Sequence, residues 1–276
     1  MGCRKRSHTS ITLTIASSMT LCCLAPLPPA TGQITPDRTL GAESSIVTPD
    51  MNIKDIPSDQ IDGGAIRGAS LFHSFQEFNI SEGRGAYFSN PPGIENILSR
   101  VTGSKHSNIL GTLGILGNAN LFLINPNGIV FGANARLDVG GSFVASTANS
   151  MVFDNGFEFS ATNPEAPPVL TINSPIGLQY RTQQPKALVN AGNLAVTSGH
   201  NLTLVGGSVA ITGQLETLGG QVSVVAVPTE SLVQLNPTGQ FLRVSPTSSP
   251  GGGDLAIANG SIRSNGGRIR IQSDWA

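Results

Sequence analysis

The chain has 276 residues, a length that fits one large domain or two modest ones. Hydrophobic residues make up 39% of it, charged residues 12% and aromatic residues 5%, and 33 residues are glycine. This composition excludes a disordered chain, because charge is low and apolar runs are frequent; it suits short strands joined by glycine turns. The formal net charge of −1 provides no basic surface of the kind that attracts nucleic acids or anionic membranes.

The first 32 residues have the pattern of a signal peptide. Basic residues at 4–6 precede an apolar core at 11–24, and small residues at 30–32 predict cleavage between Gly32 and Gln33. The core is too short and too rich in Ser and Thr for a spanning helix; a short membrane anchor is the alternative. The leader holds three of the 16 Lys and Arg residues and none of the 17 acidic ones, so the remainder has a formal charge of −4.

All three cysteines, Cys3, Cys22 and Cys23, lie within this leader. A mature chain that begins at Gln33 therefore has no disulfide, no cysteine zinc site and no thiol nucleophile. The sequence does not favour lipid attachment, because Leu21 stands directly before Cys22, where a small residue is expected.

Residues 33–80 are expected to contain short strands. The part before residue 62 is polar and broken by prolines, and Ser45–Val47 is expected to be an edge strand. In the segment that follows, Phe72 and Phe78 share one face of a predicted strand and Phe75 lies on the other. The same three rings also have helical spacing, but the turn-rich flanks favour a strand that is partly covered on both faces. We interpret the rings as core rather than as a ligand platform.

The next elements are less regular. Residues 81–93 are predicted to form a strand between loops. Residues 94–102 carry apolar side chains at helical spacing, which predicts an amphipathic helix, with a bent strand as the alternative. Arg136–Val139 and Ser142–Ala145 are predicted strands on either side of a glycine turn.

The stretch Gly117–Gly132 has the clearest local signal. Two apolar runs, Leu121–Ile124 and Ile129–Phe131, flank Asn125-Pro-Asn-Gly128. Proline suits an early turn position because its φ is fixed and it donates no hydrogen bond, and Asn-Gly tolerates positive φ. The stretch predicts strand, tight turn and strand.

From about residue 187 the sequence repeats itself. Leu202–Leu204 recurs as Val222–Val224, 20 residues on, and two glycine-led segments recur at offsets of 46 and 47 residues. These two pairs are Gly206–Ile211 with Gly252–Ile257, and Gly219–Val224 with Gly266–Ile271. The larger offsets indicate an inserted loop near 228–251, which is rich in proline. Short strands repeated at about 20 residues are typical of a β-solenoid, in which each coil covers the apolar side chains of its neighbour.

Several longer motifs together resemble one known family. The chain is similar to the filamentous-haemagglutinin N-terminal domain, the secretion domain of two-partner secretion exoproteins, in its cyanobacterial form. The motifs that carry the resemblance are Gln33–Leu40, Phe72–Phe78, Asn96–Gly103, Asn118–Ile129 and Leu137–Ala145.

The resemblance implies an all-β fold, a right-handed parallel β-helix with an N-terminal cap and small extra β elements. It also implies export into the periplasm and recognition by an outer-membrane β-barrel transporter with periplasmic POTRA domains. The family has two Asn-Pro motifs, of which the second is intact here. Its residues are Asn125, Pro126, Asn127, Gly128 and Ile129. The first motif has only a loose counterpart, formed by Asn90, Pro91, Pro92 and Gly93.

The sequence offers little for catalysis. The histidines after the leader, His73, His106 and His200, are not spaced as ligands of one metal ion. Glu77 and Glu82 are candidate paired carboxylates, but solvated positions are the better interpretation. No Gly-x-Ser-x-Gly motif occurs, and the glycines of residues 111–117 lack the Lys-Ser/Thr of a phosphate loop. We expect no enzyme, cofactor, metal, small-molecule substrate or nucleic-acid partner.

The predicted organisation is a signal peptide at 1–32, a secretion domain at 33–160 and further β-helix coils at 161–276. The expected function is that of a secreted exoprotein, found outside the cell or at its surface, whose N-terminal domain directs export across the outer membrane. The alternative is a surface adhesin or structural β-helix exoprotein, shortened relative to longer family members. The sequence does not identify an adhesion target.

Overall fold

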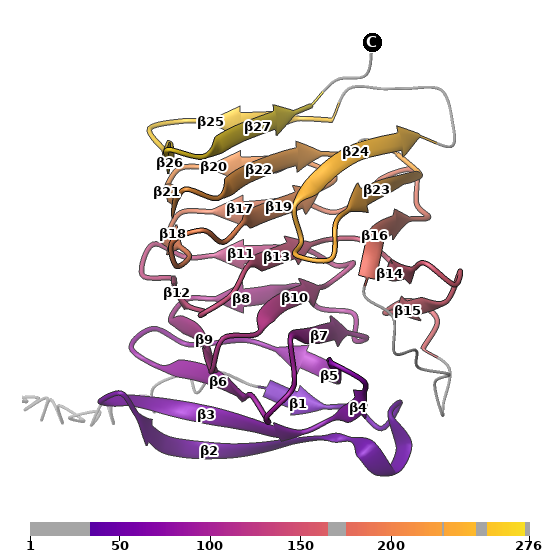
Figure 1. Cartoon of the computed structure of the whole chain (residues 1–276), viewed down its shortest axis with the longest axis vertical. Helices are drawn as coiled ribbons and strands as arrows, with labels where there is room; N and C mark the ends of the chain where they lie inside the picture. The colour runs from indigo at the N-terminus through magenta and orange to yellow at the C-terminus, as the bar shows by residue number, and fades with distance from the viewer. Residues whose placement is uncertain (1–33, 165–174, 228, 247–252, 274–276) are drawn as a thin grey trace, which may run out of the picture. The chain divides into compact units, whose positions relative to one another are not determined.

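Strands of the chain stack into successive coils in a computed structural model (Figure 1), which describes residues 34–164, 175–227, 229–246 and 253–273. The predicted leader and its cleavage site between Gly32 and Gln33 lie outside these residues. Within the described residues, no helix has the length and apolar character needed to cross a membrane. A short 3-10 helix, η1, spans Gly41–Glu43.

The described strands form four sheets, which we name A to D. Sheet A contains β1 (Ile34–Pro36), β4 (Ala65–Arg67), β5 (Ser70–Phe78), β7 (Asn96–Val101), β10 (Asn120–Ile124), β13 (Phe143–Ser146), β19 (Leu202–Gly206), β22 (Gln221–Ala226) and β27 (Arg268–Gln272). Sheet B contains β2 (Ser45–Ile53), β3 (Ile56–Gly63), β6 (Gly85–Ser89), β9 (Thr112–Leu116), β12 (Arg136–Asp138), β18 (Asn193–Ala195), β21 (Gln214–Leu218) and β26 (Ser261–Asn265).

Sheets C and D differ in their pairing. Sheet C contains β8 (Ser107–Ile109), β11 (Ile129–Phe131), β17 (Leu188–Asn190), β20 (Val209–Ile211) and β25 (Leu255–Ile257), all in parallel. Sheet D contains β14 (Ser150–Phe153), β15 (Glu158–Ser160), β16 (Pro175–Tyr180), β23 (Ser231–Leu235) and β24 (Phe241–Pro246), all antiparallel. The chain from β7 onward visits sheets A, C and B in turn and then begins the next coil, so the fold is a parallel β-helix. The all-β class and the β-helix are thus confirmed.

The repeats seen in the sequence set the register of the coils. Leu202 pairs with Val222, as the 20-residue repeat predicts. Ile211 pairs with Ile257 and Val224 with Ile271, at the predicted offsets of 46 and 47 residues. The coils before β13 are slightly longer, because residue 96 pairs with residue 120 and residue 121 with residue 143. The coil that includes β14 to β16 is much longer, because residue 143 pairs with residue 202.

Antiparallel elements at the N-terminal end form the cap that the family resemblance implies. The β2–β3 hairpin covers the first edge of sheet B, and β1 and β4 pair with β5 in sheet A. Residues 45–47 lie in β2, the outermost strand of its sheet, as expected for an edge strand.

The main core lies between the three parallel sheets. It is filled by inward side chains such as Leu121, Leu123 and Ile129, all at most 1% exposed. A second core lies between sheet A and sheet D and contains Phe122 and Ile124 from the opposite face of the same strand. Strands β7, β10, β13, β19 and β22 of sheet A are therefore buried on both faces, which explains their continuous apolar runs.

Three sequence interpretations are corrected by this arrangement. Residues 96–101 form strand β7, so the bent-strand alternative holds and the amphipathic helix was wrong. The segment near 228–251 contains the hairpin β23–β24 of sheet D rather than only a loop. Phe78 packs in the main core with Phe75, whereas Phe72 packs against sheet D.

The helix-like spacing of residues 94–102 arises because two cores share β7. Ile97 and Val101 point into the main core, and Leu98 points toward sheet D. Burial on both faces removes the simple alternation that would have predicted a strand.

Candidate functional site

The intact Asn-Pro motif forms a corner between β10 of sheet A and β11 of sheet C. Asn125 is fully buried there. Its Nδ2 donates to the Lys105 carbonyl at 3.0 Å and to Ser107 Oγ at 2.9 Å, and its Oδ1 accepts from the Asn127 amide at 2.9 Å. One amide side chain thus satisfies a backbone group within the turn and another on the preceding coil, which a buried corner requires.

Asn127 and Gly128 complete this corner. Asn127 Nδ2 donates to the Gly103 carbonyl at 2.7 Å. Gly128 has φ +113°, a conformation that favours glycine, and its amide donates to the Asn125 carbonyl at 3.1 Å. A Cβ at Gly128 would also lie 3.2 Å from the Ala187 carbonyl oxygen. The predicted turn chemistry is therefore present.

The corner is also fixed to the coils on either side of it. The Ser107 amide donates to the Gly128 carbonyl at 3.0 Å, on the preceding coil. The Asn125 amide donates to the Ser146 carbonyl at 3.0 Å, and the Ile129 amide donates to that of Ala187 at 3.3 Å, on the following coil. Backbone hydrogen bonds to both neighbouring coils thus hold the corner in addition to the side chains of Asn125 and Asn127.

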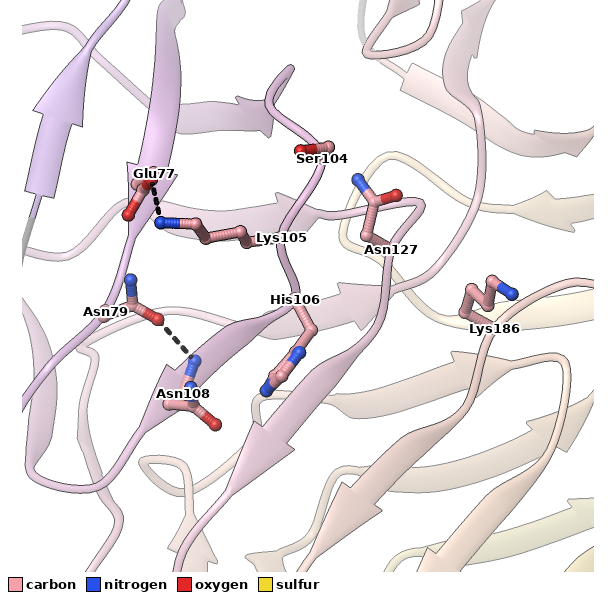
Figure 2. A pocket seen from close by; sticks show the side chains of 8 residues that line it. All are labelled: Glu77, Asn79, Ser104, Lys105, His106, Asn108, Asn127 and Lys186. Carbon is pink, nitrogen blue, oxygen red and sulfur yellow. Dashed lines mark hydrogen bonds and ion pairs between the residues drawn. The ribbon is translucent and has the colours of Figure 1, made fainter.

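A polar pocket of ≈ 460 Å³ lies beside the corner (Figure 2). Its lining residues are Glu77, Asn79, Ser104, Lys105, His106, Asn108, Asn127 and Lys186. Lys105 forms an ion pair with Glu77 at 2.7 Å, and the Asn108 amide donates to Asn79 Oδ1 at 2.9 Å (Figure 2). A second pocket of ≈ 430 Å³ also includes Asn127, together with Pro126 and Thr162. Both linings offer hydrogen-bonding groups.

The looser motif, Asn90–Gly93, lies at a different corner, between β6 of sheet B and β7 of sheet A. The Ile94 amide donates to the Pro91 carbonyl at 3.2 Å, and Gly93 has φ +84°. The Asn90 amide group lies against Ile94 O and Asn118 N, each at 3.2 Å. The structure therefore does not bring the two motifs into one site.

The catalytic candidates are also separate. His73 is fully buried on β5, where burial lowers its pKa to about 3 despite the nearby Asp62 charge, and it contacts Ser45 Oγ at 2.9 Å. His106 lines the pocket, and the carbonyl of His200 accepts from Thr217 Oγ1 on sheet B at 2.7 Å. Across the described ranges, no group of three or more His, Cys, Asp or Glu side chains is placed to hold a metal ion.

Glu77 and Glu82 do not form a carboxylate pair. The partner of Glu77 is the cation Lys105, and Glu82 lines another pocket with Arg84 and Arg136. This arrangement agrees with the interpretation of both residues as polar surface groups.

Sequence reasoning missed a buried polar network close to the corner. Arg100 is only 1% exposed, and Asp37 and Thr102 lie in the same network. The one available signal was an arginine placed among the apolar residues of β7, between Leu98 and Val101.

Comparisons with known proteins support this picture. The family model of the TPS secretion domain matches residues 32–274. A heme/hemopexin-binding protein of Haemophilus influenzae is 29% identical in an alignment that covers 43% of this chain and 13% of that protein. The chain therefore matches a small part of that relative's length.

Two solved structures align with most of this chain, and the first of them is similar in fold. The HMW1 secretion domain from Haemophilus influenzae has a TM-score of 0.58 at 22% identity, over 87% of this chain and 57% of that one. The filamentous hemagglutinin secretion domain has a TM-score of 0.49 at 14% identity, over 87% and 99% of the two chains.

Proposed function

Because this chain belongs to the TPS secretion domain family, we propose that its Asn125–Ile129 corner is the structural signal on which export depends. The chain is a two-partner secreted exoprotein with an N-terminal secretion domain, and such a protein has an outer-membrane transporter as its partner. The observation that supports the corner is its set of contacts: Asn125 and Asn127 bind backbone groups of the preceding coil through their side chains. The family is one of secretion domains rather than enzymes, and we infer no catalytic role.

The proposed partner is a β-barrel with periplasmic POTRA domains, which meets the chain in the periplasm after the leader is removed between Gly32 and Gln33. Strand addition is the proposed binding mode. Support comes from β2, whose outer edge pairs with no strand among the described residues, and from Ile46 on it, which is 58% exposed. Replacing Ile46 by Lys should weaken binding to the transporter; equal binding would exclude this edge.

The chain is proposed to cross the outer membrane unfolded and to fold outside. Stacking of coils buries apolar surface, which stabilises by roughly 25 cal/mol per Å² and can favour outward movement without ATP. The absence of cysteine after residue 23 supports threading, because no disulfide can close a loop ahead of a pore. A disulfide engineered to form in the periplasm should slow export, and unchanged export would argue against threading.

The corner is tested by the double variant Asn127→Ala with Gly128→Ala. Export is assayed with the transporter, and the assay without it gives the background. In the presence of the transporter, the variant should be exported roughly tenfold less than the unsubstituted chain, which corresponds to about 1.4 kcal/mol in one equilibrium. The matched control is Asn155→Ala with Gly156→Ala, because it changes the same dipeptide in the turn between β14 and β15, where Gly156 has φ +78°. Normal release of the first variant would refute the proposal.

The roles of the other predicted signals need separate tests. Asn90–Gly93 is proposed as a weaker secretion motif, since its turn closes a different corner. Substituting Gly93, which has φ +84°, should reduce export less than the double variant does.

The predicted cleavage site is tested by N-terminal sequencing. The exported protein should have Gln33 as its first residue.

The alternative function is that of a surface adhesin or structural exoprotein. The relative described as a heme/hemopexin-binding protein favours a ligand-binding passenger, but only 13% of its length is matched. If export of this chain is the same with and without the transporter, this alternative gains over the secretion role.

A further inference from the structure

Arg100 is a buried cation on β7 whose partners come from three distant segments. Its Nε donates to Ser74 Oγ at 2.9 Å, Nη2 to Thr39 Oγ1 at 2.8 Å and Nη1 to the Ser160 carbonyl at 2.6 Å. The guanidinium also lies 4.1 Å from the centroid of the Phe159 ring. A buried charge is tolerated only with such a set of partners and a compensating charge.

Asp37 supplies the compensating charge. Its carboxylate accepts hydrogen bonds from Thr39 Oγ1 at 2.6 Å, from Ser74 Oγ at 2.7 Å and from Thr102 Oγ1 at 2.5 Å. Burial acts to raise the pKa of Asp37, but these hydrogen bonds outweigh it and hold the pKa below its usual value. The segment that follows the predicted leader is thereby joined to the end of β7.

Thr102 begins the loop on which the Asn125–Gly128 corner rests. The next residue, Gly103, accepts from Asn127 Nδ2 at 2.7 Å, and Lys105 accepts from Asn125 Nδ2 at 3.0 Å. A Cβ at Gly103 would lie 2.0 Å from the Gln76 carbonyl oxygen, so the loop is packed directly against the neighbouring backbone. Asp37 therefore holds one end of a tightly packed loop whose carbonyls define the corner.

We propose that Asp37 is a positioning residue for the Asn125–Gly128 corner, acting through Thr102, and that Arg100 holds Asp37 in place through their shared partners Thr39 and Ser74. In this arrangement the N-terminal segment and the corner form one coupled unit, and the corner reaches its final geometry only when residues 37–39 are in place. The inference takes its significance from the proposed function. Its test measures the folded protein alone, so it can fail while the export role of the corner stands.

The test compares Thr102→Val with Thr102→Ser in the full chain. Valine keeps almost the same shape but removes the Thr102 hydroxyl, which lies 2.5 Å from Asp37 Oδ2 and 3.1 Å from the Phe75 carbonyl oxygen, whereas serine keeps the hydroxyl. Hydrogen exchange of the Asn127 and Gly128 amides, both of which bond to Asn125, reports opening of the corner. We expect roughly tenfold faster exchange in the valine variant, the effect of losing one charged hydrogen bond, and wild-type exchange in the serine variant.

The carboxylate is tested with a matched control. Asp37→Asn should also accelerate exchange at Asn127 and Gly128, and Thr102→Val should add little to it, because both changes break one link. The control is Asp59→Asn, which weakens another buried carboxylate, 2.8 Å from Arg84, outside the network. It should leave the corner amides unchanged. If Thr102→Val and Asp37→Asn accelerate hydrogen exchange only at residues 34–41 and not at the corner, the proposal is overturned.

Discussion

Tyr87 on β6 crosses over Gly114 on β9 and donates a hydrogen bond to Asp138 on β12 at 3.0 Å. The three residues are paired in register across sheet B. A Cβ at Gly114 would lie 2.4 Å from Tyr87 Cε1, so the ring can lie flat only because this position has no side chain. Burial is the larger cause that raises the pKa of Tyr87, and the hydrogen bond to Asp138 is the next. The hydroxyl therefore stays protonated and can donate.

We expect Gly114→Ala to destabilise the protein by about 1–3 kcal/mol, the usual cost of overpacking. The measurement is the free energy of unfolding in urea. The same change in a Tyr87→Ala background should cost much less, because the clashing ring is gone. Additive effects of the two substitutions would show that the ring is not the cause.

Because of His73, the stability of the folded chain is expected to depend on pH. Its Nδ1 contacts Ser45 Oγ, and its Nε2 has no hydrogen-bond partner among the residues that the structure describes. Burial lowers its pKa from 6.5 to about 3, and Asp62 opposes this shift. Between these two values the unfolded chain binds a proton that the folded chain does not, so stability falls as pH falls.

The expected loss of stability is about 1 kcal/mol per pH unit below 6.5, and it is absent above that pH. Urea unfolding between pH 7 and pH 4 measures it. The variant His73→Gln removes the titrating group and should lose less stability over the same range, although it starts lower. Equal slopes for both proteins would contradict the assignment to His73.

At the scale of elements, sheet A differs from sheet B in having a second covered face. Phe122 points away from the coil interior on β10, yet it is fully buried under sheet D. Gln214 on β21 of sheet B begins a strand with one buried face and is exposed. The same alternation along a strand therefore has different consequences in the two sheets.

We expect Phe122→Ala to cost about 3–5 kcal/mol, as for any core phenylalanine. Gln214→Ala should change the free energy of unfolding by less than about 0.5 kcal/mol, as for an exposed position. Both values come from denaturant unfolding. A small effect at Phe122 would mean that sheet D is not packed on sheet A in solution.

The turn at residues 125–128 was predictable from its own residues, because proline and Asn-Gly fix the local backbone. Its contacts with Gly103, Ser107 and Ala187 were not, since they depend on how many residues each coil takes. The sequence repeats predicted coil pairing correctly from residue 202 onward, where the paired strands have similar sequences, and this held even across the inserted β23–β24 segment.

Sheet D was beyond the reach of the sequence. Gly177 pairs with Gln234 in antiparallel register, across 57 residues and with no repeat spacing to reveal it. Both excursions into sheet D leave the coil after a sheet A strand, β13 and β22, and return at sheet C. The corner after β10 also joins sheet A to sheet C. Both insertions into the β-helix therefore lie at connections of this kind.

At the scale of the whole molecule, the last described coil is less covered than the others. Ile269 and Ile271 align with the fully buried Val222 and Val224, but they are 46% and 47% exposed. Among the described strands, nothing pairs beyond β27 in sheet A. Exposed apolar side chains beside an unpaired edge favour association.

We therefore expect the chain to self-associate as its concentration rises and expect Ile269→Thr with Ile271→Thr to reduce this. Threonine keeps the strand propensity and removes apolar area. Light scattering over a concentration series measures the effect. Ile46→Thr, at the 58% exposed position on β2, is the control and should change association less. Equal association of all three proteins would exclude the last coil as the contact.

The stacking of coils also fixes a ratio between contour length and height. A coil takes 20 residues between Leu202 and Val222 and 24 between Asn96 and Asn120. Fully extended, that much chain reaches about 70–80 Å, whereas adding one strand layer extends the stack by only about 5 Å. In the threading that we propose, each coil formed outside the pore would shorten its chain roughly fifteenfold, and coil formation would therefore oppose backward sliding.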